Sequence, residues 1–144
     1  MTALAVIVDT NMIVAALLTS RPDSPVVRVL DGMLAARFPF AVSEPLLAEY
    51  RVVLARPKLC KLHGLDDEAI ESLLLEVVRH AIVVEAVRGP PAPDPGDPML
   101  WDMLATRLDL ALVTGERALL SDEGMNGRVV SPAQFIAGRA ASPP

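Results

Sequence analysis

The sequence predicts an α/β protein, a three-layer α/β/α sandwich in which helices cover both faces of a parallel sheet. Two observations predict it. Short apolar runs alternate with segments of helical spacing along the chain, and the first run, 4–8, is apolar at every position. Such a β-branched run is typical of a central strand that is buried on both faces of a parallel sheet. At Asp9 the pattern changes to helical spacing, so a carboxylate marks the junction of strand and helix.

The other elements follow in order from caps and periodicity. Further strands are expected over 38–42, 82–84, 110–114 and 128–130. Residues that can cap a helix begin the expected helices, and proline follows three of them: Thr10, Ser24, Ser43, Asp66, Asp97 and Ser131. We expect a connector over 58–65 and a proline-rich loop over 88–98. Residues 1–139 are expected to form one domain, and 140–144 a frayed tail.

Composition narrows the class of protein. The apolar fraction is 52%, yet the apolar runs are far shorter than the roughly 20 residues of a membrane span. We therefore expect no membrane partner. The amino terminus lacks the pattern of a signal peptide, and a single cysteine excludes an internal disulfide, which together indicate a cytoplasmic protein. The aliphatic surplus is compatible with a homodimer.

The net charge of −5 argues against a protein that coats nucleic acid, where a basic excess is usual. It leaves room for an enzyme with an acidic metal site and a local basic rim. Four basic residues fit such a rim, and they fit a solvated helix end equally well: Arg51, Arg56, Lys58 and Lys61.

Four acidic residues come at points that a doubly wound sheet brings towards one cleft. Asp9 follows the first strand and Glu116 the fourth, and these strands are commonly neighbours. Glu49 lies at the margin of an apolar helical stripe, and Asp97 begins the helix before the fourth strand. Each also has a structural explanation, as a helix cap, a dipole partner or an edge residue. Asp9 is the hardest to explain without a site.

A cluster of carboxylates suits metal chemistry, because a divalent cation relieves the repulsion among them. Oxygen ligands favour Mg²⁺ or Mn²⁺ over Zn²⁺. Such an ion neutralises charge on a phosphate and lowers the pKa of a bound water. An acidic pocket of this kind is therefore suited to hydrolysing a phosphodiester bond.

Five segments in order resemble the PIN-domain family: 8–11, 43–58, 93–97, 112–120 and 130–135. The resemblance implies a parallel five-stranded sheet and a Mg²⁺- or Mn²⁺-dependent endoribonuclease. Many members are the toxin of a type II toxin–antitoxin pair (VapC-like), so it also implies RNA as substrate and an antitoxin protein as partner.

Matched to the family residue by residue, Asp9, Glu49 and Asp97 take the places of three metal-binding acids. Glu116 stands where the family more often has aspartate, so its longer side chain departs from the pattern. Three further residues fall at positions that commonly support the site: Thr10, Asn11 and Thr114.

Other functions remain open on the sequence. The departure at Glu116 and the acidic charge fit a degenerate PIN domain, a non-catalytic module that binds RNA or protein. A haloacid-dehalogenase phosphatase would have aspartate where this chain has Asn11, and a response-regulator receiver would have a lysine beyond Lys61. Cys60 and His63 have the spacing of zinc ligands, but two ligands do not make a site.

Overall fold

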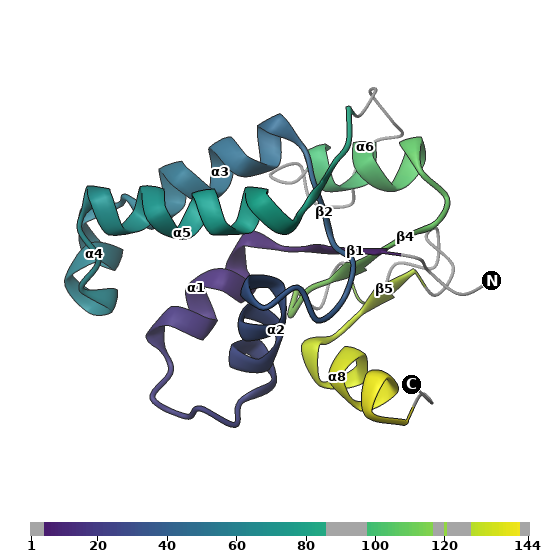
Figure 1. Ribbon diagram of the computed structural model, residues 1–144, viewed down its shortest axis with the longest axis horizontal. Helices are drawn as coiled ribbons and strands as arrows, with labels where there is room; N and C mark the ends of the chain where they lie inside the picture. Colours follow the sequence, from purple (N-terminus) through teal and green to yellow (C-terminus); the bar gives the residue numbers. More distant parts are fainter. Residues whose placement is uncertain (1–4, 86–97, 117–119, 121–127, 142–144) are drawn as a thin grey trace.

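A computed structural model of the chain describes residues 5–85, 98–116, 120 and 128–141. It is an α/β structure in which every described strand pair is parallel. Helices α3 (Glu44–Leu54), α5 (Asp67–His80) and α6 (Pro98–Thr106) lie on one side of the strands, and α2 (Pro25–Leu34) and α8 (Pro132–Ala141) lie on the other (Figure 1). This arrangement agrees with the layered α/β class that the sequence predicts.

The central strands form a three-stranded sheet in the order β1-β4-β5. Strand β1 (Ala5–Val8) pairs with β4 (Leu110–Val113), and β4 pairs with β5 (Val129–Val130). All eight residues of β1 and β4 are buried, as expected of strands covered on both faces. The register places Val8 opposite Val113, so the carboxyl ends of β1 and β4 meet at one edge.

The other two strands form a separate sheet of two, in which β2 (Ala41–Val42) pairs with β3 (Ile82–Val83). The expectation of one continuous five-stranded sheet is therefore not met in the described residues. An isolated parallel bridge between Val6 and Phe40 is the link between the two sheets.

The contact between β1 and the segment before β2 is short. The backbone N–H of Val6 donates to the carbonyl of Pro39 at 3.2 Å, which begins a ladder. Two residues further along β1, the carbonyl of Val8 accepts the hydroxyl of Tyr50. A side chain from α3 thus bonds to the backbone of β1 close to its bridge with Phe40.

The described part of the chain forms seven helices: α1 (Thr10–Leu18), α2 (Pro25–Leu34), α3 (Glu44–Leu54), α4 (Pro57–His63), α5 (Asp67–His80), α6 (Pro98–Thr106) and α8 (Pro132–Ala141). Three of the predicted caps make their side-chain hydrogen bonds: Ser43 accepts from the N–H of Leu46, Asp66 from the N–H of Ala69 and Ser131 from the N–H of Gln134. Proline follows Ser24 and Ser131 at the start of a helix, as expected.

Two local predictions are corrected. Thr10 is the first helical residue of α1, and Asp9 holds the cap position. The expected connector over 58–65 is wrong, because α4 occupies most of it and ends at Gly64, which has φ of 74°. Pro57 occupies the first position of α4, where its missing N–H and fixed φ suit the start of a helix.

Of the tail predicted over 140–144, α8 includes 140 and 141, and 142–144 lie outside the described residues. The longest described helix, α5, has 14 residues. Within the described ranges, no helix has both the length and the apolar character that crossing a bilayer requires.

Candidate metal centre

Asp9 lies at the carboxyl end of β1 and is 2% exposed. Its backbone N–H donates to the carbonyl of Val113 at 3.0 Å, and its carbonyl accepts from the N–H of Met12. Its side chain makes no capping hydrogen bond to α1. The carboxylate instead accepts the hydroxyl of Thr114 at 2.7 Å. The simple explanation of Asp9 as a helix cap is therefore insufficient.

Thr114 comes directly after β4 and is fully buried. Besides donating to Asp9, its hydroxyl oxygen accepts the backbone N–H of Glu116 at 3.1 Å. One hydroxyl thus joins the carboxyl ends of β1 and β4. Glu116 is partly buried, and this bond brings its backbone to the edge of the sheet that carries Asp9.

Glu49 reaches the same region from α3. The hydroxyl of Thr10, which is 3% exposed, donates to Glu49 Oε2 at 2.5 Å. Glu49 is partly buried, in agreement with its predicted position at the margin of the apolar stripe. Asn11, the third supporting residue, is exposed in the first turn of α1.

Tyr50, on the apolar stripe of α3, is a residue of this region that the sequence does not assign to the site. Tyr50 is fully buried, and its hydroxyl donates to the carbonyl of Val8. Burial raises the pKa of the phenol far above its usual value of about 10, and the negative charges of Asp9 and Glu49 raise it further. Both carboxylates therefore lie near one protonated phenol. The available signal was a single tyrosine beside Glu49 in an aliphatic stripe.

The predicted site is only partly described. Asp97, the fourth predicted acid, lies outside the described residues. Among the residues that are described, no three His, Cys, Asp or Glu side chains come together closely enough to hold a metal ion. The predicted acids that the structure describes, Asp9, Glu49 and Glu116, would bind an ion through carboxylate oxygens. Asp9 is buried at the carboxyl edge of a parallel sheet, where ligands commonly bind. This donor set fits a hard cation such as Mg²⁺ or Mn²⁺.

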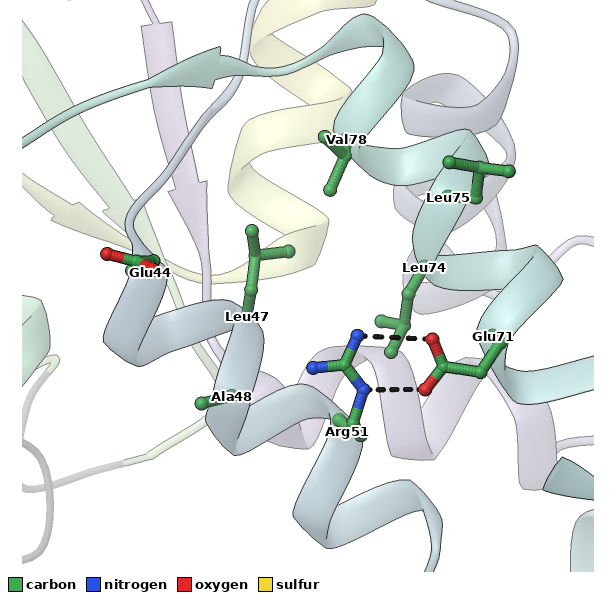
Figure 2. A pocket seen from close by; sticks show the side chains of 8 residues that line it. All are labelled: Glu44, Leu47, Ala48, Arg51, Glu71, Leu74, Leu75 and Val78. Atoms are coloured by element: carbon green, nitrogen blue, oxygen red, sulfur yellow. Dashed lines mark hydrogen bonds and ion pairs between the residues drawn. The ribbon is translucent and has the colours of Figure 1, made fainter.

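A separate groove lies between α3 and α5, and Figure 2 shows its lining. Leu75 and Val78 of α5 line it, and Arg51 of α3 donates to both carboxylate oxygens of Glu71 at 2.6 and 3.1 Å. That hydrogen bond lowers the pKa of Glu71. None of the predicted site acids lines this groove. Arg51, one of the four candidates for a basic rim, is engaged in an ion pair on the surface (Figure 2).

Cys60 and His63 have a structural role. The thiol of Cys60 donates to the carbonyl of Leu54, and Nε2 of His63 lies 3.0 Å from the same oxygen. Nδ1 of His63 accepts the N–H of Leu65, so Nε2 carries the proton and donates. The pair closes the carboxyl end of α3.

The chain was also compared with known protein families. A family model described as "PIN domain" matches residues 5–118. The match begins at β1 and ends just beyond Glu116, so it includes all four predicted acids. No curated protein matches the chain significantly.

Proposed function

Because the chain belongs to the PIN domain family, we propose that it is a Mg²⁺- or Mn²⁺-dependent endoribonuclease that hydrolyses RNA phosphodiester bonds. PIN domains are generally nucleases, and they generally use divalent metal ions. The observation that carries the proposal is Asp9, a carboxylate that is almost completely buried at the carboxyl edge of the sheet, where its side chain accepts from Thr114 and makes no capping bond to α1.

In this proposal the ion is held by the carboxylates of Asp9, Glu49, Asp97 and Glu116. When bound, the ion neutralises charge on the phosphate and lowers the pKa of a water molecule. Asp97 takes part on the strength of the family resemblance, since it lies outside the described residues. Glu116 has a longer side chain than the aspartate usual at its position, and the bond from Thr114 brings its backbone to the same edge.

The supporting residues orient the acids. Thr114 donates to Asp9 and Thr10 donates to Glu49, so each carboxylate is held by a hydroxyl from another element. A side chain held in this way loses little further freedom when it binds an ion, which favours binding. Asn11 is exposed in the first turn of α1, and we propose that it supports the site from its rim.

The test compares RNA cleavage by variants of the proposed metal-binding acids with cleavage by a variant of an exposed acid on α3. Asp9→Asn and Glu49→Gln keep the shape of the side chain and remove its charge. We expect each to lower the rate of cleavage of a fluorogenic RNA by about 100-fold or more, because the charge that holds the ion is lost. Glu44→Gln is the matched control, since Glu44 is exposed on the same helix as Glu49. Circular dichroism establishes that each variant is folded, and undiminished cleavage by Asp9→Asn would refute the proposal.

The second candidate is a non-catalytic PIN domain that binds RNA or a protein. The observation in its favour is that no group of three metal-ligating side chains is found within the described residues. A Mn²⁺ titration separates the two candidates. If the protein is a nuclease, the wild type binds Mn²⁺ and Asp9→Asn loses that affinity. If it is a non-catalytic binding module, the wild type and Asp9→Asn bind RNA equally well without Mn²⁺.

The cellular role that we propose is the toxin of a toxin–antitoxin pair, acting in the cytoplasm as a homodimer. The support is the resemblance of five ordered sequence segments to that family. Induced expression of the wild-type chain in bacteria should arrest growth, and Asp9→Asn should not. Growth that continues with the wild-type chain, although it cleaves RNA in vitro, would argue against the toxin role. Sedimentation measures the oligomeric state.

A further inference from the structure

We propose that Tyr50 is a positioning residue: its hydroxyl, donated to the carbonyl of Val8, sets the spacing between Asp9 and Glu49. This inference rests on the proposed metal site. Asp9 belongs to the end of β1 and Glu49 to α3, so a site that uses both acids requires the two elements to be held in one arrangement. Tyr50 is the residue next to Glu49, and Val8 is the residue next to Asp9.

The residues on either side of Asp9 are each hydrogen-bonded to α3. On one side the carbonyl of Val8 accepts the Tyr50 hydroxyl, and on the other side Thr10 donates to Glu49 at 2.5 Å. Two successive residues of α3 are thus bonded to the two neighbours of Asp9. The bond from Tyr50 reaches the backbone of β1, and therefore fixes the helix to the strand. The bond from Thr10 joins two side chains and fixes only the carboxylate.

A phenol at this position is not required for filling the core. The residues one turn before and after Tyr50 on the same buried stripe are Leu46 and Leu54, both fully buried. Burying a hydroxyl among such residues is unfavourable unless it forms a hydrogen bond. The Tyr50 hydroxyl forms that bond to the carbonyl of Val8, the last residue of β1 and the neighbour of Asp9. The hydroxyl thus links α3 to the backbone of β1 beside the proposed site.

The variant Tyr50→Phe tests this inference, because it keeps the ring and removes the one oxygen. We expect its affinity for Mn²⁺ to fall by about tenfold or more, as for residues that orient metal ligands. We expect kcat for RNA cleavage to fall while KM stays unchanged. In the chain without metal, amide exchange at Asp9 and Glu49 should become faster.

The control is Val29→Ala, which removes buried carbon atoms from α2, on the opposite side of the strands from α3 (Figure 1). It lowers stability without touching the proposed site, so it should leave Mn²⁺ affinity and kcat unchanged below its melting temperature. Wild-type affinity in Tyr50→Phe would overturn this inference alone. A wild-type chain that binds no Mn²⁺ would overturn the proposed function and this inference together.

Discussion

Replacing Gly32 by alanine should destabilise this protein, although the same change stabilises most helices. Gly32 is a buried residue inside α2. A Cβ atom at this position would lie 2.4 Å from Cε2 and 3.0 Å from Cδ2 of Phe38. The Phe38 ring cannot simply move away, because it packs edge-on against Phe40 and Phe135, with ring centroids 6.3 and 4.9 Å apart.

Two opposed effects set the magnitude. Alanine in a helix interior is favoured over glycine by about 1 kcal/mol. An added carbon atom that forces a packed ring to shift costs about 1–3 kcal/mol. The overlap with Phe38 is about 1 Å measured against an ordinary contact of roughly 3.4–4 Å, which places the cost in the upper part of that range. We therefore expect a net loss of about 1–2 kcal/mol in the free energy of unfolding.

Urea unfolding followed by Trp101 fluorescence measures this loss. The matched control is Gly138→Ala in α8, where a Cβ atom would meet nothing within 4 Å. That variant should be as stable as the wild type or more stable, by up to about 1 kcal/mol. In a double-mutant cycle, Phe38→Leu should remove most of the cost of Gly32→Ala, because leucine leaves room for the new methyl group. A Gly32→Ala variant that is more stable than the wild type would refute this reasoning.

Two further predictions follow from the site. The Tyr50 phenol stays protonated in the folded state and ionises near pH 10 in the unfolded state, so the unfolded state binds fewer protons above pH 10. The free energy of unfolding of the wild type relative to Tyr50→Phe should therefore fall by about 1.4 kcal/mol between pH 9 and 11. A tyrosinate absorbance that appears near pH 10 in the folded protein would contradict this, and the chain has a single tyrosine to report it. Mn²⁺ at about 100 times its dissociation constant should raise the free energy of unfolding of the wild type by about 2.7 kcal/mol. Asp9→Asn should show no such gain. An equal gain in the wild type and in Asp9→Asn would mean that the ion binds at a site other than the proposed one.

The positions of Asp9 and Glu49 in the fold could be predicted from local sequence. An apolar strand that ends in a carboxylate predicted the position of Asp9, and helical periodicity predicted that Glu49 lies at the edge of a buried stripe. The resemblance to a family predicted that Thr10 and Thr114 lie beside these acids, where they donate to Glu49 and Asp9. The direction of each bond could not be predicted, because residues 39 and 105 positions apart come together only through packing.

The sequence by itself determined the local elements, because caps and hydrophobic periodicity act within a few residues. Ser43 and Asp66 begin their helices as predicted, and β1 is buried on every residue. The tertiary structure decided how these elements meet. In it, the described strands form two sheets rather than one. The hydroxyl of Tyr50, a buried residue of α3, bonds to the backbone of β1. The physical reason is that a buried hydroxyl bonds to whichever carbonyl packing brings within reach, and no pattern along the chain specifies that carbonyl.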